Sequence, residues 1–517
     1  MAYPEPANVS PWYLRNITQA LALDSVSGNV YVRTDAQFNI SNANITVGNV
    51  GVTSIGNIDV SGNTMPISGN IAISGGNITI DSLPEVEIKN DAGNPIPISR
   101  TTSVNSQTNP IYVEGVNNAS FFAPTQSDAF GRLRVSNPLT LFDTQNKYSD
   151  QGQFVSDLTG SASSTYDQDS NTFALAVTGS GDSVVRETLK TFIYQPGKSL
   201  FVLNTFVMNT PTTNVTQRVG YYNDNNGIFF EASGETLNMV IRSYSSGSLV
   251  EDRVPQSLWN GDRLTGLGGA NNPSGIELDV SVAQIFWTDI EWLGVGSVRV
   301  GFVINGQYYV CHTFNHANQA GNTTTYMGTA VLPLRYELSS TGPAATMTQI
   351  CSTVISEGGY SMSGIPTGIG HNLGSSIVLP NDLSFKPLIS IRLKSTNPDA
   401  IVLPTDFTIV PVDQAVVKYR VYTQAVTTGG TWVSAGPNSS VEYNLSPTTL
   451  VSGQKTVSSF LVSNNQSINT PQDERFDFTE QLIRNPFTPT MYEYVITAAT
   501  TGTNIDVYAA INWQEIT

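Results

Sequence analysis

The chain has 517 residues, of which 13% are charged and 39% hydrophobic, and its formal net charge at pH 7 is −17. This length predicts roughly three domains, and the hydrophobic share without a high charge density separates the chain from disordered proteins. The acidic balance without a run of Lys or Arg excludes a nucleic-acid binder, since such proteins need a basic stripe facing the phosphates.

The N-terminal residues 1–6 have neither a basic start nor an apolar core, so the sequence predicts no signal peptide. No stretch of about 18 apolar residues is present, which excludes insertion into a membrane by a helix. Few charges and many Asn, Ser, Thr and Gly residues are typical of an extracellular β-protein or a virus surface protein. We expect a virion protein, which is made in the host cytoplasm and leaves the cell by lysis.

Residues 1–28 are predicted to anchor the chain to a larger particle. Ser10 is a suitable cap for a short helix that has Pro11 at its first position. The apolar stripe of this helix, the candidate virion anchor, consists of Trp12, Leu14, Ile17 and Leu21. The alternative is a loose terminus.

Residues 29–115 contain an internal repeat, and its unit is Asn, aliphatic, any residue, aliphatic. Clear copies begin at Asn29, Asn44, Asn49, Asn57, Asn70 and Asn77. The two aliphatic side chains of a unit are spaced i, i+2, so they point to one face of a short strand. The Gly that usually precedes the Asn is suited to a tight turn.

Such a unit cannot be stable alone. Two buried aliphatic side chains contribute roughly 3–6 kcal/mol, and ordering about seven residues costs a similar amount or more. Three copies of the chain wound around one axis would cover the aliphatic pairs. The repeat therefore predicts a trimeric β shaft, with a loose Asn/Gly-rich linker as the alternative.

Residues 116–136 are interpreted as a transition, and residues 137–365 as a large β-sandwich of the jelly-roll kind. The strict alternation from Val298 to Ile304, followed by Asn305-Gly306 and a second alternating run, predicts a hairpin with a type I′ turn. Residues 220–230 are predicted to form a second strand, turn and strand, and residues 237–241 a further strand.

Residues 366–382 are rich in Gly, Ser and Pro and are interpreted as a linker. Residues 383–517 alternate again, for example from Ile389 to Leu393 and from Ile505 to Trp513, and predict a second, smaller sandwich. The predicted fold class is therefore all-β: an N-terminal repetitive β shaft followed by two antiparallel β-sandwich domains.

Several segments resemble virion structural proteins of tailed phages, particularly those of cyanobacterial and other aquatic hosts. They are residues 128–136, 225–231, 256–262 and 284–318. The resemblance covers residues 120–320 well and the C-terminal domain loosely. It implies a location in the virion without specifying the head, neck, baseplate or tail.

The segment Asp289-Ile290-Glu291-Trp292-Leu293-Gly294 resembles the catalytic strand of laminarinase-type β-glucanases, which have a concanavalin-like jelly roll. The pattern of that family is Glu-x-Asp-x-Glu. Glu291 matches its acid/base and Asp289 its helper, but Trp287 occupies the position of the nucleophile. Retaining hydrolysis needs a second carboxylate about 5.5 Å away, so the resemblance implies a scaffold or a glycan-binding surface and no working glucanase. Coincidence in an aromatic strand is the alternative.

No metal or cofactor site is predicted. His312 and His316 are four residues apart, which on a strand separates them by about 13 Å, so we expect hydrogen-bonding roles for them. His371 completes the set of histidines. The run from Asn223 to Gly227 offers too few carboxylates for calcium and is predicted to be a turn.

Cys311 and Cys351 lie in strand-like contexts and are expected to be buried, free thiols, although a disulfide between them is compatible with the sequence. Three aromatic residues near predicted loops are candidate glycan contacts: Trp259, Tyr360 and Trp432. Packing in a core is the alternative for each of them.

These observations predict a structural component of a phage virion that is not an enzyme. It would be a homotrimeric fibre or appendage, attached through its N-terminus to other virion proteins, with projecting sandwiches that contact the host surface. The alternative is a lectin-like tip that binds host glycans. A polysaccharide depolymerase is a third hypothesis, and Trp287 argues against it.

Overall fold

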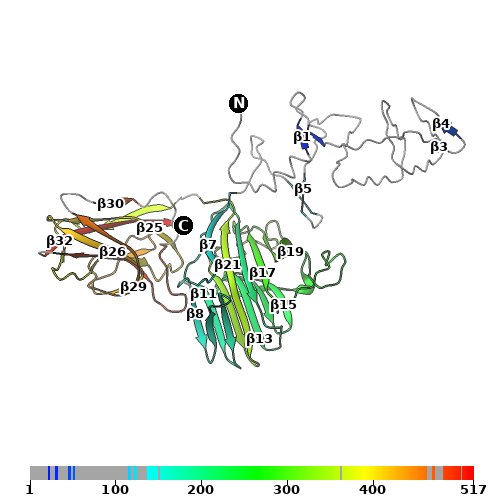
Figure 1. Ribbon diagram of the computed structural model, residues 1–517, viewed down its shortest axis with the longest axis horizontal. Helices are drawn as coiled ribbons and strands as arrows, with labels where there is room; N and C mark the ends of the chain where they lie inside the picture. Colours follow the sequence, from blue (N-terminus) through cyan, green and yellow to red (C-terminus); the bar gives the residue numbers. More distant parts are fainter. Residues whose placement is uncertain are drawn as a thin grey trace. The chain divides into compact units, whose positions relative to one another are not determined.

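The computed structural model describes 137–149, 152–360, 364–462, 468–471, 481–501 and 504–516, together with six short strands before residue 125. These short strands are β1 (Leu21–Leu23), β2 (Val30–Val32), β3 (Ile45–Val47), β4 (Val50–Val52), β5 (Glu114–Asn117) and β6 (Phe121–Pro124). The chain divides into two compact units, of which the second consists of Val116–Phe122 and Gln126–Thr517. The described residues are almost entirely β-structure, as predicted (Figure 1).

Four of the short strands bear on the predicted shaft. Strands β2, β3 and β4 coincide with the Asn-aliphatic units, and they form two-stranded antiparallel pairs, β1 with β2 and β3 with β4. The other repeat units lie outside the described residues, so the trimeric shaft stays a prediction. Trp12, Leu14 and Ile17 also lie outside them. Leu21 belongs to strand β1, which corrects the expectation that a helical stripe extends to it.

The large sandwich has one eight-stranded and one seven-stranded antiparallel sheet. The eight-stranded sheet contains β7 (Leu139–Thr144), β9 (Ser163–Asp167), β10 (Thr172–Val177), β12 (Leu200–Val207), β17 (Gln284–Ile290), β18 (Val298–Ile304), β19 (Gln307–Phe314) and β21 (Ala345–Ser356). The seven-stranded sheet contains β8 (Phe154–Thr159), β11 (Ser183–Thr188), β13 (Val215–Tyr222), β14 (Gly227–Ser233), β15 (Thr236–Ser243), β16 (Val250–Pro255) and β20 (Leu334–Ser340).

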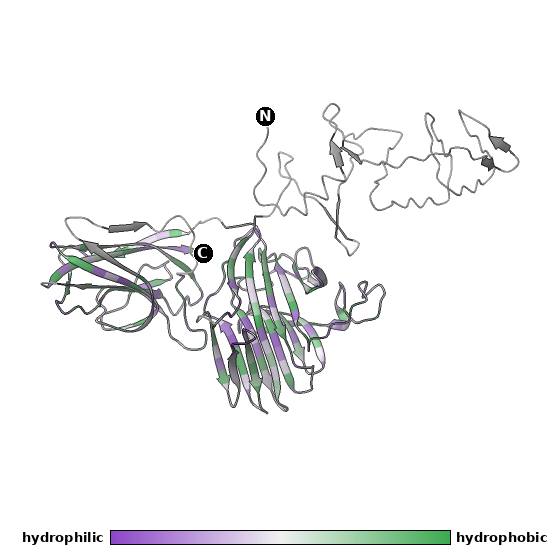
Figure 2. Ribbon diagram, viewed as in Figure 1, coloured by the Kyte–Doolittle hydropathy of each residue, from purple (hydrophilic) through white to green (hydrophobic). Residues whose placement is uncertain are grey.

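Alternation along the strands explains why these segments pack as two layers. Hydrophobic and hydrophilic residues alternate along many strands of the large sandwich (Figure 2). The inward residues form a continuous core in which Phe206, Phe230, Phe286 and Phe302 are fully buried. Their rings contact one another at centroid distances of 5.2–6.1 Å, which adds to the stabilisation from burial.

The predicted hairpin at Asn305-Gly306 is confirmed. Strands β18 and β19 pair from Ile304 opposite Gln307, and the two turn residues have φ values of 53° and 76°. Positive φ at both positions defines a type I′ turn. The predicted strands at 220–230 and 237–241 are also confirmed as parts of β13, β14 and β15.

The C-terminal sandwich is smaller, as predicted, with a five-stranded and a six-stranded sheet. The first contains β22 (Ile365–Gly370), β23 (Ile377–Leu379), β25 (Ile401–Pro411), β30 (Ile468–Pro471) and β32 (Ile505–Ile516). The second contains β24 (Lys386–Leu393), β26 (Val416–Thr428), β27 (Val433–Ser434), β28 (Val441–Asn444), β29 (Thr449–Val462) and β31 (Glu493–Thr500).

The interpretation of 366–382 as a linker was wrong. This segment contains most of β22 and all of β23, and both strands pair with β32. Its glycines reflect crowding: a Cβ on Gly368 would lie 2.0 Å from Asn512 Oδ1, and one on Gly370 would lie 2.8 Å from Ala510 Cβ. Glycine in a strand often marks such a close approach.

The described part of the chain has one short 3₁₀ helix, η1 (Gln256–Leu258). No helix in this part is long and apolar enough to cross a membrane. Helix η1 opens the long connection between β16 and β17, which leads from the edge of the seven-stranded sheet to the middle of the eight-stranded one.

Candidate functional site

The outer face of the eight-stranded sheet carries the residues that the glucanase-like pattern singled out. Phe286 and Ile290 point into the core, so Trp287 and Asp289 between them point to the opposite face. Glu291 follows directly after the end of β17. Asp289 and Glu291 line the same open cavity of ≈510 Å³.

Strand register places further side chains on this face. Asp289 pairs with Phe201 on β12 and with Arg299 on β18, and Arg299 in turn pairs with Thr313 on β19. Cross-strand partners share one face of a sheet. The cavity therefore has carboxylate, guanidinium, hydroxyl and amide groups around it, from Tyr194, Ser199, Asp289, Glu291, Arg299 and Asn315.

Asp289 is neutralised within the site. Its carboxylate accepts a hydrogen bond from Arg299 Nε at 3.0 Å and forms an ion pair with Nη2 of the same guanidinium. The Arg299 side chain remains 58% exposed, whereas that of Asp289 is 10% exposed. The guanidinium is therefore reachable from solvent, and the carboxylate lies beneath it.

Three aromatic rings lie beside the polar cavity on the same sheet face. Trp287, Phe201 and Tyr308 contact one another, with ring centroids 5.8–6.0 Å apart. Trp287 is 3% exposed, and its Nε1 has no hydrogen-bond partner among the described residues. Tyr308 is 54% exposed, so the cluster presents an aromatic surface to solvent. Stacking on sugar rings is one use of such surfaces.

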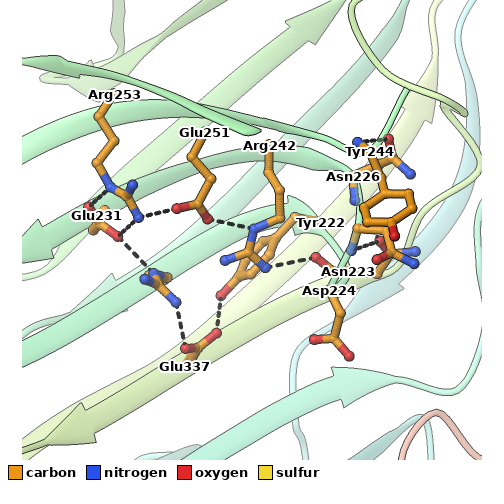
Figure 3. Close-up of polar contacts among 12 residues, drawn as sticks. Tyr222, Asn223, Asp224, Asn226, Glu231, Arg242, Tyr244, Glu251, Arg253 and Glu337 are labelled. Atoms are coloured by element: carbon orange, nitrogen blue, oxygen red, sulfur yellow. Dashed lines mark hydrogen bonds and ion pairs between the residues drawn. The ribbon is translucent and has the colours of Figure 1, made fainter. Parts of the chain in front are cut away.

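The outer face of the seven-stranded sheet carries a second polar cluster, the arginine–glutamate network (Figure 3). Glu231 accepts hydrogen bonds from Arg218 at 2.8 Å and from Arg253 at 2.9 Å. Arg253 also pairs with Glu251, which accepts a hydrogen bond from Arg242 at 2.7 Å. Ion pairs between alternating arginines and glutamates thus connect the side chains of strands β13, β14, β15 and β16.

The network continues over an aromatic pair. Arg218 donates to Glu337 at 2.7 Å, and Tyr222 donates to the same carboxylate at 3.3 Å. The Tyr222 ring contacts Phe229 at 4.5 Å, and Arg242 lies over both rings at 5.4 and 5.1 Å. Since these charged groups find partners within the sheet, the network is a structural feature.

The predicted turn that begins at Asn223 is confirmed, and it lies between β13 and β14 of this sheet. Asn223 Oδ1 accepts backbone hydrogen bonds from Asn225 and Asn226, which is the arrangement of an Asx turn. Asp224 pairs with Arg335 at 2.6 Å. Among the described residues, no cluster of three or more His, Cys, Asp or Glu side chains is placed to hold a metal ion.

The histidines hydrogen-bond to the backbone, as expected. His312 Nδ1 accepts a bond from Asn260 N at 3.2 Å, and His371 Nδ1 accepts one from Ala509 N at 3.0 Å. Burial lowers the pKa of both imidazoles. His316 Nδ1 lies 2.7 Å from the Gly296 carbonyl, and its ring stacks on Tyr326 at 4.0 Å.

Both cysteines are free thiols, as expected, with Cys311 buried and Cys351 partly buried. Cys311 belongs to the core of the large sandwich, and burial raises the pKa of its thiol well above the ordinary value.

The predicted glycan contacts are scattered. Trp259 is 1% exposed in the core and donates from Nε1 to the Val254 carbonyl at 3.0 Å, so its expected role as a sugar platform is corrected. Tyr360 is half-buried and packs against a small apolar cluster. Trp432 is also half-buried, and Arg392 lies 3.9 Å from its ring centroid. None of the three lines the cavity.

Sequence reasoning missed Arg299, Tyr194 and Asn315. Alternation along β18 places Arg299 on the face opposite Val298 and Val300, which the sequence does show. Its meeting with Asp289 depends on the pairing of β17 with β18. Tyr194 and Asn315 come from segments outside the strands, and no pattern in the sequence indicated them.

No protein-family model matches the chain, and a search of curated proteins finds no match. Solved structures similar to the chain include a β-1,3-glucanase from Mycobacterium marinum, at 12% identity and a TM-score of 0.28, over 42% of this chain and 98% of that one. The carbohydrate recognition domain of Emp47p matches at 9% identity and a TM-score of 0.27, over 45% and 99%.

A third similar structure is a carbohydrate esterase from the Shiga toxin-encoding bacteriophage phi24B, at 8% identity and a TM-score of 0.25, over 43% of this chain and all of the other. Each of these similarities covers about two fifths of the chain.

Proposed function

We propose that the chain is a structural subunit of a phage virion, a trimeric appendage that projects two β-sandwiches. The observation that carries the proposal is the size of the strands in the repeat. Strands β2, β3 and β4 have three residues each and form only two-stranded sheets. A two-stranded sheet is marginally stable at best in water, so further copies of the chain are needed to cover it.

The oligomeric state tests this proposal. Light scattering is expected to give three times the chain mass of 55.6 kDa. Deleting residues 1–115 should lower the mass toward that of one chain, because the deletion removes the repeats and leaves both sandwiches intact. A full-length monomer, or an undiminished trimer after the deletion, would contradict the assignment of the repeats to a shaft.

A second candidate function, binding of a surface glycan, is supported by the cavity beside the aromatic cluster. A volume of ≈510 Å³ falls within the range of small-molecule sites, roughly 300–1,000 Å³. Arg299 offers donors, Glu291 offers acceptors and Tyr308 offers an exposed ring, which together suit the hydroxyl groups and apolar faces of sugars. The site would let the projecting sandwich hold polysaccharide at the host surface.

A glycan array with the full-length protein tests the second function. We expect Arg299→Ala to weaken binding about tenfold or more, which corresponds to a charged hydrogen bond of roughly 1.5–3 kcal/mol. Arg484→Ala is the matched control, since Arg484 is another ion-paired arginine and lies on the C-terminal sandwich. Equal binding by Arg299→Ala and the unchanged protein would place glycan recognition elsewhere, with Trp432→Ala as the next variant to measure.

A further inference from the structure

A second glutamate, distant in the sequence, lies near Glu291 at the ends of neighbouring strands. Glu357 follows the end of β21, and its backbone N–H donates to the Ser199 carbonyl at 3.0 Å. Leu200, the residue after Ser199, pairs with Ile290 on one side and with Ser356 on the other. Glu291, Ser199 and Glu357 therefore form a row across three adjacent strand ends.

The two glutamates face the same side of the sheet. Ile290, Leu200 and Ser356 are 0%, 1% and 4% exposed, so the residue adjoining each of them in the row turns to the outer face. Two strand spacings separate the α-carbons of the glutamates by about 10 Å. The carboxyl groups of inverting glycosidases stand roughly 6.5–9.5 Å apart, a span that two glutamate side chains on this row suit.

The surroundings of the two carboxyl groups differ. Glu291 is exposed beside the cavity. Glu357 is half-buried and accepts a hydrogen bond from Ser199 Oγ at 2.9 Å. Burial raises the pKa of Glu357, the nearby charge of Asp289 raises it further, and the Ser199 hydrogen bond and Arg299 oppose the shift. A half-buried carboxyl group with a raised pKa suits the role of a proton donor.

An unused donor nearby also indicates a ligand. The Trp287 indole is more than nine-tenths buried and lies on the same face, two residues before Asp289. Its N–H has no acceptor among the described residues. A buried donor without a partner costs roughly 1–3 kcal/mol, and a sugar hydroxyl bound over this face would supply the acceptor.

We propose that Glu357 and Glu291 act as general acid and general base in the hydrolysis of a glycosidic bond with inversion. Glu357 gives its proton to the bridging oxygen as the bond from the anomeric carbon to that oxygen breaks. Glu291 takes a proton from the water whose oxygen bonds to the anomeric carbon. One water is consumed, and solvent restores both carboxyl groups. Glu291 and Ser199 line the cavity of the glycan proposal, and Glu357 adjoins it through its hydrogen bond with Ser199. The activity thus rests on the glycan proposal and is independent of the trimeric shaft.

This chemistry differs from the retaining scheme that the β17 pattern suggested. There the second carboxylate would come from the position of Trp287 on the same strand, and indole cannot serve. Here the second carboxylate comes from β21, and the wider gap leaves room for the attacking water. The anomeric configuration of the first product therefore distinguishes the two schemes: inversion indicates Glu291 with Glu357, and retention indicates the β17 pattern.

The experiment uses the full-length protein with soluble β-1,3-glucan, mixed-linkage β-glucan and alginate at mildly acidic pH. Release of reducing ends is measured, together with proton NMR of the first product anomer. We expect inversion at the new reducing end. Glu291→Gln and Glu357→Gln should each lower the rate by about 10²–10⁴-fold, and the double variant should lose little more.

Glu442→Gln is the matched control, because Glu442 is an ion-paired carboxylate on the other sandwich and should leave the rate unchanged. Circular dichroism and glycan binding of the two active-site variants are measured in parallel. Binding without hydrolysis of any of the three polymers, or products with retained configuration, would overturn the hydrolase inference and leave the binding proposal standing. If the unchanged protein bound no glycan, both the hydrolase inference and the binding proposal would be overturned.

Discussion

The two outer faces of the large sandwich differ in how their polar side chains are paired. Each presents charged and aromatic side chains on a flat β-sheet. On the seven-stranded sheet, Glu231 lies between Arg218 and Arg253, with its side chain 1% exposed (Figure 3). On the eight-stranded sheet, Arg299 is 58% exposed and lines a cavity, and the Trp287 indole N–H has no partner in the described part of the chain.

A structural polar cluster differs from a functional one in whether its buried groups find partners within the protein. Buried charges that find partners within their own sheet add order and leave nothing for a ligand. A buried polar group that remains unpaired costs stability, and a ligand that pairs with it can recover that cost. We therefore expect substitutions on the first face to change stability, and substitutions on the second face to change binding or rate.

The largest expected effect is that of Glu231→Ala. Removing this buried carboxylate takes one acceptor from each of Arg218 and Arg253, which keep Glu337 and Glu251 as partners. Losing hydrogen bonds to a buried charged group costs about 1.5–3 kcal/mol. Urea unfolding measures the loss, with Glu291→Gln as the control on the open face, where a change of less than about 0.5 kcal/mol is expected. Equal effects of the two variants would contradict the contrast between the faces.

A double-mutant cycle on Arg242 and Glu251 tests whether members of the arginine–glutamate network are energetically coupled. The two side chains are 7% and 14% exposed and hydrogen-bond at 2.7 Å. We expect a coupling energy of about 1–3 kcal/mol, because each charge remains buried when the other is removed. The Arg242→Met, Glu251→Leu double variant should be more stable than the sum of its single variants predicts. Additive single effects would show that the network does not act as a unit.

On the open face, Trp287→Phe is expected to change stability by less than about 1 kcal/mol. The substitution loses some aromatic area but also removes the unpaired indole N–H, and the two effects oppose each other. Thermal unfolding checks the prediction, and Trp259→Phe is the control, since the Trp259 indole N–H is paired in the core. A larger loss for Trp287 than for Trp259 would indicate an acceptor for the Trp287 donor.

The smallest effects concern pH, and they have opposite signs on the two faces. Burial opposes ionisation of Glu251, yet the hydrogen bond and charge of Arg242, with the charges of Arg253 and Arg218, hold its pKa below the ordinary value of 4.5. A lowered pKa gives stability that is present above 4.5 and is lost as the pH falls through the folded-state value. The Glu251→Gln variant should therefore lose less stability on acidification.

Glu357 behaves in the opposite sense. Burial raises the pKa of this carboxyl above 4.5, so its contribution is present below 4.5 and is lost as the pH rises through the raised value. The Glu357→Gln variant should lose less stability as the pH rises over that interval. Unfolding free energies measured across the acid range check both signs, and parallel curves for the two variants would contradict them.

Local patterns predicted the secondary structure well where one rule dominated. Asn305-Gly306 specified its turn because both residues adopt positive φ readily. Composition was misleading at 366–382, because glycines that make room for a neighbouring strand cannot be distinguished in the sequence from glycines in a linker. The prediction that Trp259 contacts a glycan was also wrong, because a tryptophan in a connecting segment can turn inward to the core when its N–H finds a backbone acceptor.

By itself, the sequence determined the β-class, the alternating faces and the unusual Trp287 beside Asp289, because the period of a strand is fixed by its backbone. The pairing of the strands became apparent only in the folded chain. It placed Arg299 against Asp289, and it put Glu357, 66 positions after Glu291, in the same row of the sheet. Pairing between distant strands depends on the packing of the whole core, which no local pattern records.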